Sequence, residues 1–441
     1  MTAPGAAPGL VLAAPASASG KTTLTLALLR HLRDAGVRVA SCKAGPDYLD
    51  PAFHAAASGR PCRSLDGWAM RPETLAALAW AAGDDGALVI AEGVMGLFDG
   101  TAGGDGSTAD LAAATGWPVV LVVDVKGQAA SAAATVNGFH SFRPGLALGG
   151  VIFNRVGGDK HERMLRAAVA PLGVPVLGAL RRHADLALPD RHLGLVQAAE
   201  HPDLETFLAR AAAIVGREVD VSALVALARP LTLPRPAAGH RPGPPPLGQR
   251  LAVAQDLAFA FTYPWLLEAW RAEGAEILPF SPLADEAPPA GADAVYLPGG
   301  YPELHAGRLA GNARFLDGLR AAAGLAKPVL GECGGYMVLG QGLVAADGTR
   351  HPMAGLLGLE SSFARRRLQL GYRRARLAAD GPLGAAGTGF RGHEFHFATI
   401  VETGARQPLF FCQDAEGTEL PPAGERRGSA AGSFLHLIDR A

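Results

Sequence analysis

The chain has 441 residues and a mass of 45.3 kDa, which is enough for two or more domains with separate hydrophobic cores. Its 40 basic and 41 acidic side chains nearly cancel, so no global field favours nucleic acid as a partner. Hydrophobic residues make up 49% of the chain, which excludes a disordered polypeptide. The stretch 127–142 carries no charged residue but is too short to span a membrane.

The N-terminus (MTAPG) has no basic segment ahead of its apolar residues, so no secretory signal is expected. The four cysteines, Cys42, Cys62, Cys333 and Cys412, are far apart and form no CxxC pair. This pattern is typical of a reducing compartment without a disulfide or zinc framework. We therefore expect a cytoplasmic protein without a membrane partner.

In the first half, short apolar runs alternate with segments of helical length. Helices are expected at 22–35 and 72–82. Near-continuous Val/Ile/Leu runs separated by helices predict a parallel sheet covered on both faces, and thus an α/β domain. The expected strands are 9–13, 37–42, 87–91, 119–123, 149–153 and 174–178.

A proline-rich run separates this half from the second. Residues 229–250 hold seven prolines and no acidic residue, so they predict a semi-rigid linker. We place an N-terminal domain at 1–228, the linker at 229–249 and a C-terminal domain at 250–441. The second half repeats the α/β pattern, with expected strands at 250–254, 276–279, 294–297 and 328–330.

A phosphate-binding loop is predicted where the first strand meets the first helix. The segment APASASGKTT places Ser19, Gly20, Lys21, Thr22 and Thr23 at this turn. Backbone N–H groups would hold the phosphates of ATP, Lys21 would reach their oxygens, and Thr22 would bind Mg²⁺. Pro15 stands where the P-loop pattern has its first glycine, so an ordinary strand–loop–helix turn is the alternative.

Two further strand ends carry residues that suit a metal–nucleotide site. Lys43 and Asp47 follow the second strand in KAGPDYLDP, and Glu92 follows the third in EGVMGLFDG. Thr22, Asp47 and Glu92 would supply oxygen ligands to Mg²⁺. The alternative is turn and N-cap duty for Asp47, and a solvated strand end for Glu92.

An asparagine at another strand end is a candidate for nucleotide recognition. Asn154, in VIFNR, is placed to read a base edge, and a turn-forming asparagine is the alternative.

The second half carries a candidate nucleophile. In GECGGYM, Cys333 lies in a strand–elbow–helix pattern whose glycines allow a tight turn, and the helix N-terminus is expected to lower the pKa of the thiol. Amides of Gly299, Gly300 and Gly334 would form an oxyanion hole. His436 (SFLHL) is the candidate base, with His393 and His396 (GHEFH) as rivals that spacing does not exclude.

These motifs resemble the cobyrinic and hydrogenobyrinic acid a,c-diamide synthases, the glutamine-dependent amidotransferases of cobalamin biosynthesis. The resemblance covers nearly the whole chain, and the related cobyric acid synthases lack the KxGPDYxDP segment. The matching motifs are SGKTT, KAGPDYLDP with His54, EGVMGLFDG, GSTA at 106–109, LPGGYPE, GECGGYM, GHEFH and SFLHL.

The resemblance implies a P-loop, dethiobiotin-synthetase-like N-terminal domain and a flavodoxin-like class I glutamine amidotransferase domain. Cys333 would attack glutamine with His436 as base. ATP would phosphorylate a corrin carboxylate while Lys21, Lys43 and Mg²⁺ offset charge, and ammonia would then displace phosphate. The a and c acetate side chains would become amides.

One departure from the class I pattern concerns the residue that orients the histidine. Many members carry Glu two positions after it, whereas this chain has Ile438 and then Asp439. We therefore expect a Cys–His dyad with modest glutaminase activity until the synthetase site is occupied.

A corrinoid polycarboxylate needs cationic partners. Arg366 and Tyr372, in and beside the arginine clusters 365–367 and 373–376, are candidate substrate residues, as are Asp99 and Ser107. A solvated basic strand edge is the alternative for the arginines.

Two other functions fit the same residues. One is a P-loop switch or partitioning ATPase with a degenerate glutaminase module, and the other is the same chemistry on nickel sirohydrochlorin. The sequence leaves open whether the corrinoid carries cobalt and whether the chain forms a homodimer.

Overall fold

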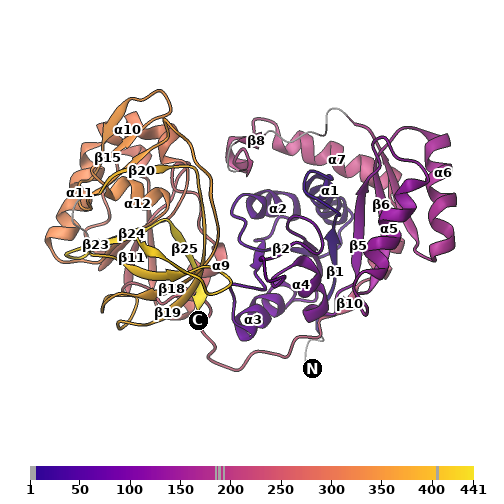
Figure 1. Cartoon of the computed structure of the whole chain (residues 1–441), viewed down its shortest axis with the longest axis horizontal. Coiled ribbons are helices and arrows are strands. Elements are labelled where there is room, and N and C mark those ends of the chain that lie inside the picture. The colour runs from indigo at the N-terminus through magenta and orange to yellow at the C-terminus, as the bar shows by residue number, and fades with distance from the viewer. Residues whose placement is uncertain (1–5, 184–185, 187–189, 192–193, 404–406) are drawn as a thin grey trace. The chain divides into compact units, whose positions relative to one another are not determined.

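The computed structural model describes residues 6–183, 186, 190–191, 194–403 and 407–441. The first five residues of the N-terminus, where no signal is expected, lie outside these ranges. The chain forms two compact units (Figure 1). The first contains Met1–Trp68 and Pro72–His240, and the second contains Ala69–Arg71 and Arg241–Ala441.

The first unit is built on a parallel sheet, as the sequence predicts. Its strand order is β3-β2-β4-β1-β5-β6-β7, and β10 pairs antiparallel with the first two residues of the central strand β1. The strands are β1 (Pro8–Ala13), β2 (Val39–Ala44), β3 (Arg63–Leu65), β4 (Leu88–Glu92), β5 (Val119–Asp124), β6 (Leu148–Val156), β7 (Val176–Arg181) and β10 (Arg229–Pro230). A separate hairpin joins β8 (Asp190–Arg191) and β9 (Gly194–Leu195).

Apolar side chains on both faces explain why this sheet forms. Along β1, Leu10 and Leu12 join a core cluster with residues of α1 and α7, and Val11 on the opposite face is equally buried. α1 and α7 pack side by side (Figure 1). The helices of this unit are α1 (Lys21–Asp34), α2 (Asp50–Ser58), α3 (Pro72–Ala82), α4 (Thr108–Thr115), α5 (Ser131–Ser141), α6 (Asp159–Val169), α7 (Leu204–Glu218) and α8 (Val221–Ala226).

The second unit has a sheet of its own, in the order β12-β11-β13-β14-β24-β23, which is parallel except for β23. Its strands are β11 (Arg250–Ala254), β12 (Glu276–Phe280), β13 (Ala294–Leu297), β14 (Val329–Glu332), β23 (Glu425–Arg427) and β24 (Ala430–Ser433). Its helices are α9 (Pro264–Ala272), α10 (Ala306–Gly311), α11 (Ala313–Gly324) and α12 (Gly334–Leu339). The α/β class predicted for both halves is confirmed.

Two further sheets complete the second unit, and the sequence analysis did not expect any of their strands. One, in the order β22-β21-β18-β19-β25, is antiparallel; the other has the order β16-β15-β17-β20. Their strands are β15 (Gly342–Val344), β16 (Arg350–Pro352), β17 (Leu359–Ser362), β18 (Gln369–Leu377), β19 (Gly389–His396), β20 (Thr399–Thr403), β21 (Phe410–Gln413), β22 (Glu419–Ala423) and β25 (Leu435–Arg440).

An ion pair between the partly exposed Arg71 and the buried Asp439 ties a short segment from early in the sequence to the second unit. The guanidinium and backbone N–H of Arg71 donate to Asp439 on β25, at 2.8–3.0 Å. The backbone N–H groups of Gly243 and Arg440 donate to the same carboxylate. This contact explains why residues 69–71 group with the second unit. The predicted boundaries at 228 and 250 remain predictions.

The core of the second unit supplies a stability test. Phe315 on α11 is fully buried beside Phe259 and Phe280, whereas Phe411 on β21 is 47% exposed. Phe315→Ala should lower the free energy of unfolding by about 3–5 kcal/mol, because it leaves a cavity. Phe411→Ala is the matched control and should cost less than about 1 kcal/mol. Denaturant unfolding measures both, and equal losses would contradict this core assignment.

Candidate active sites

The predicted phosphate loop connects β1 to α1, and its backbone turns at two left-handed residues. Gly20, directly before the helix, has φ 92°, and Ala18 has φ 60°. Ala18 thus adopts a conformation that P-loops normally assign to glycine, at a cost of roughly 1–2 kcal/mol. A side chain at Gly20 would collide with the amide of Asn154. The loop therefore follows a tight path despite lacking the earlier glycines.

Lys21 opens α1, and its ammonium points back across this loop. Nζ donates to the carbonyl of Met95 at 2.6 Å. Burial lowers the pKa of Lys21, and Glu92 opposes that shift. A buried ammonium held by carbonyl oxygens is well placed to exchange these partners for phosphate oxygens.

A buried carboxylate, Glu92 at the end of β4, collects partners from three elements. Its Oε1 accepts from Thr22 Oγ1 at 2.6 Å and from Lys43 Nζ at 2.9 Å, and its Oε2 lies 2.7 Å from His54 Nε2. Burial alone would raise the pKa of Glu92, but Lys43 and His54 hold it well below its usual value. Asp50 Oδ2 lies 2.5 Å from Lys43 Nζ.

The side chains around Glu92 also perturb one another. Burial and the neighbouring Asp47 raise the pKa of Asp50 to about 7. Burial would lower the pKa of His54, but Cys62 and Glu92 raise it to about 10. The cluster thus mixes cations and carboxylates in a space closed to water.

The structure brings Thr22 and Glu92 together, as the sequence analysis expects, but the aspartate nearest to them is Asp50. Asp50 Oδ2 is 3.5 Å from Thr22 Oγ1, whereas Asp47 Oδ1 accepts from the backbone N–H groups of Leu49 and Asp50. Asp47 thus stabilises the turn before α2, which is the alternative that the sequence left open for it. Its role as a metal ligand remains a prediction.

The donor set around Thr22 consists of a hydroxyl and carboxylates, the hard oxygen ligands that suit Mg²⁺. Within the part of the chain that the structure describes, no group of three or more His, Cys, Asp or Glu side chains is arranged to hold a metal by itself. A Mg²⁺ ion at this place remains a prediction.

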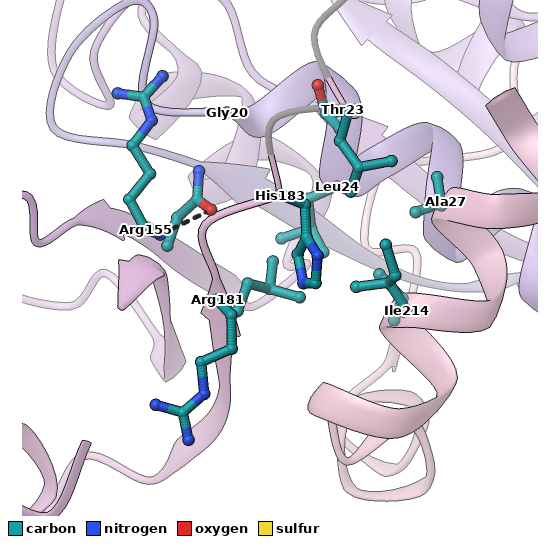
Figure 2. A pocket seen from close by; sticks show the side chains of 13 residues that line it. Gly20, Thr23, Leu24, Ala27, Arg155, Arg181, His183 and Ile214 are labelled. Atoms are coloured by element: carbon teal, nitrogen blue, oxygen red, sulfur yellow. Dashed lines mark hydrogen bonds between the residues drawn. The ribbon is translucent and has the colours of Figure 1, made fainter. Parts of the chain in front are cut away.

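A cavity of about 280 Å³ opens beside the phosphate loop, lined by residues that include Gly20, Thr23 and Asn154 (Figure 2). In this view Ala27 of α1 and Ile214 of α7 lie on one side of the cavity, and the guanidinium groups of Arg155 and Arg181 lie on the other. Apolar walls with polar groups at one edge suit a planar base.

The amide of Asn154 has partners within the protein. Its Nδ2 donates to the carbonyl of Ser19 at 2.9 Å, and its Oδ1 accepts from the backbone N–H of Arg155. It thereby fixes the phosphate loop to the end of β6. The predicted contact of Asn154 with a base edge remains a prediction.

The predicted substrate residues belong to both units, and those in the first unit already have structural tasks. Ser107 forms a capping box at the start of α4, and Asp99 accepts from the backbone N–H of Gly96. In the second unit, Arg366 is exposed. Tyr372 on β18 packs edge-on against His393. Their roles toward a substrate remain predictions.

Cys333 lies between β14 and α12 in a conformation rare for a side-chain-bearing residue, with φ 48° and ψ −103°. Strain of this kind is typical of nucleophile elbows. The expectation of a lowered thiol pKa is wrong for the free chain. Burial raises the pKa of Cys333, and the carboxylate of Glu303 adds to the increase. The backbone N–H of Gly334 works in the opposite direction but is outweighed.

His436 and Cys333 both lie close to Gly299. A methyl placed on Gly299 would collide with the imidazole of His436, 3.2 Å from Nε2, and would lie 3.4 Å from Cys333 Cβ. The structure therefore places His436 beside the elbow. Burial lowers the pKa of His436 to about 3, with help from the neighbouring His393 and His396.

His393 and His396, the rival candidates, lie on β19. His393 is paired across the sheet with His436. His396 stacks on Phe434, with their ring centroids 3.8 Å apart.

The glycines expected to form the oxyanion hole lie on neighbouring backbone segments, and Gly299 is close to Cys333. A methyl on Gly334 would lie 3.0 Å from the backbone nitrogen of Gly300, so these two segments touch. The imidazole of His436 and Cys333 both lie against Gly299, as described above. The arrangement places an imidazole and several glycine backbones close to a buried thiol, and the oxyanion-hole role of these glycines remains a prediction. A thiol beside an imidazole suits the chemistry of acyl transfer.

Comparison with known proteins assigns the two units to a class. Residues 10–196 match the CobQ/CobB/MinD/ParA nucleotide binding domain, and residues 250–440 match the CobB/CobQ-like glutamine amidotransferase domain. The chain is thus a glutamine amidotransferase joined to a nucleotide-binding domain.

Full-length relatives define the family. The chain is 56% identical to hydrogenobyrinate a,c-diamide synthase of Rhizobium meliloti (strain 1021), over 98% of this chain and 99% of that protein. It is 55% identical to the enzyme of the same name from Rhodobacter capsulatus, over 98% of both chains. The chain belongs to the family of the hydrogenobyrinate a,c-diamide synthases, which are glutamine-dependent amidating ligases.

The elbow makes one glycine critical. A methyl at Gly335 would collide with the carbonyl of Leu297, whereas nothing lies near Gly324 at the end of α11. Gly335→Ala should therefore destabilise the second unit and abolish glutamine hydrolysis. Gly324→Ala, the same change at an open position, should leave the unfolding temperature nearly unchanged and the rate of glutamine hydrolysis within about twofold of the natural protein. Thermal unfolding and glutamate release measure the pair, and an active Gly335→Ala protein would contradict the proposed elbow geometry.

Proposed function

We propose that the chain converts the a and c acetate side chains of hydrogenobyrinic acid to amides, using ATP and glutamine. The juxtaposition of Cys333 and His436 carries this proposal, because a buried thiol beside an imidazole suits the release of ammonia from glutamine. The names of the relatives support the metal-free corrinoid over the cobalt-containing one. Family membership also disfavours a switch ATPase.

At the second unit, proton transfer from Cys333 to His436 starts the reaction. Burial favours the neutral thiol and the neutral imidazole in the free chain, so the ion pair forms only against a cost. The sulfur attacks the amide carbon of glutamine, and N–H groups of Gly300 and Gly334 stabilise the oxyanion. His436 returns the proton to the leaving ammonia, and water then releases glutamate from the thioester.

At the first unit, the chain activates a carboxylate. Phosphoryl transfer from ATP gives an acyl phosphate and ADP, and ammonia then displaces phosphate to form the amide. Mg²⁺ bound with the nucleotide would supply charge neutralisation. Lys21 would balance phosphate charge, Glu92 and Thr22 would hold the metal, and Lys43 would approach the reacting carboxylate.

We propose the cytoplasm as the location of this reaction. The cysteines at positions 42, 62, 333 and 412 are free and buried, which fits a reducing compartment. Among the described residues, no helix has both the length and the apolar character needed to cross a bilayer. A homodimer is compatible with this function but is not required by it.

Replacing the nucleophile should separate the two reactions. Cys333→Ala should abolish amidation with glutamine but retain synthesis from ammonium chloride, because the synthetase site is untouched. Cys412→Ala, at another buried cysteine, is the matched control and should keep both reactions. Amide formation with each nitrogen donor is measured by mass spectrometry. Glutamine-dependent synthesis by Cys333→Ala would contradict the proposal.

The identity of the substrate is tested with paired corrinoids. Hydrogenobyrinic acid and cobyrinic acid are incubated in parallel with ATP, Mg²⁺ and glutamine, and the products are analysed by mass. We expect two amidations on the metal-free corrinoid and a lower kcat/KM with the cobalt form. Preference for cobyrinic acid would reassign the substrate, and omission of Mg²⁺ should stop both reactions.

A further inference from the structure

The residue directly before the nucleophile carries a buried carboxylate. Glu332 ends β14, and its Oε2 lies 3.8 Å from Nδ1 of His436. The two side chains are only 8% and 2% exposed. Neutral imidazole at this distance makes at most a weak contact, but an imidazolium would be strongly attracted to the carboxylate in so dry a space.

Two further hydrogen bonds fix this carboxylate in place. Tyr296, on the adjacent strand β13, donates its hydroxyl to Oε2 at 2.8 Å. The backbone N–H of Leu437 donates to Oε1 at 3.3 Å. Leu437 directly follows His436. Glu332 therefore binds the backbone beside His436 with one oxygen and lies near the imidazole with the other. It therefore joins the parallel sheet to the strand that supplies the base.

The other acidic residue near His436 in the sequence is used elsewhere. Asp439 accepts hydrogen bonds from Arg71, Gly243 and Arg440, as described for the fold. Its carboxylate is thereby committed to a guanidinium and to backbone N–H groups. The sequence position three residues after the histidine consequently does not supply the group that orients it.

The imidazole is oriented so that its two nitrogens face different partners. Nε2 lies near Gly299 and Cys333, as described above, and Nδ1 faces Glu332. We infer that Glu332 is a positioning residue for glutamine hydrolysis, holding Nδ1 of His436 and stabilising the imidazolium formed when Nε2 accepts the thiol proton. This inference rests on the proposed function.

The groups around His436 disfavour its protonation, so the nearby carboxylate of Glu332 matters for stabilising the imidazolium. The neighbouring histidines on β19 lower the pKa of His436, whereas no other carboxylate is as near to its Nδ1 among the described ion pairs. Burial raises the pKa of Glu332 to about 7, which its hydrogen bonds with Tyr296 and Leu437 partly oppose. The titratable groups that act on Glu332, Cys333 and His436 are Tyr296 on β13, Glu303 in the turn after it, and His393, Glu394 and His396 on β19.

The sign of the pH dependence follows from this raised pKa. Glu332 is ionised above about pH 7 and becomes neutral as the pH falls through that value. Only the ionised form stabilises an imidazolium. The kcat for glutamine hydrolysis should therefore decline on the acid side of about pH 7 in the natural protein.

Glu332→Gln tests the inference with a nearly isosteric change. We expect kcat for glutamine to fall by about tenfold or more, with little change in KM, because positioned acid–base catalysis is lost after substrate binds. The acid limb near pH 7 should disappear. Synthesis from ammonium chloride should be retained, which shows that the chain is folded. Glu425→Gln, at another buried glutamate of the second unit, is the matched control and should change none of these quantities.

A second variant decides the matter if Glu332→Gln does not fold. Tyr296→Phe removes one hydrogen bond that stabilises the Glu332 carboxylate, so its pKa should rise and the acid limb should move to higher pH. An unchanged acid limb and unchanged kcat in a folded Glu332→Gln protein would overturn the inference, as would an unmoved limb in Tyr296→Phe. Either result would leave the proposed function intact, since that function is tested separately by Cys333→Ala and by the paired corrinoids.

Discussion

The buried carboxylate of Glu92 is the interaction on which the first unit depends. An isolated charge in a dry interior costs several kcal/mol, so it must be matched by cations and donors. Lys43 from β2, His54 from α2 and Thr22 from α1 provide them. These contacts bring the ends of two strands and two helices to one place beside the phosphate loop. The chemistry and the packing of this region therefore cannot be varied independently.

In the second unit, the nucleophile and its base come from different sheets. Cys333 follows a strand of the parallel sheet, and His436 lies on the antiparallel sheet. Gly299 lets the imidazole approach the cysteine, and Gly335 lets the helix after the elbow approach β13. The strained backbone of Cys333 persists because packing on every side determines it.

The sequence predicted the parallel strands well because they are buried on both faces and read as continuous apolar runs. β18, by contrast, carries Arg373, Arg374 and Arg376, and such half-exposed strands have no comparable signal. The proximity of Thr22 and Glu92 could be predicted, because one lies at the start of a helix and the other ends a strand at the same edge of the sheet. The places of Asp50 and His54 could not be predicted, since they depend on how α2 turns. The contact of Glu332 with His436 depends on the pairing of distant strands, and the raised thiol pKa depends on burial, so sequence spacing revealed neither.

The contact between Arg71 and Asp439 has a consequence for how this chain can be divided. A fragment that begins at Arg241 would contain the buried Asp439 carboxylate but not the guanidinium that neutralises it. Leaving such a charge without its partner typically costs about 3–5 kcal/mol. A cut in the proline-rich run would therefore separate these two charges, and the second half alone would be less stable than the same segment in the full chain.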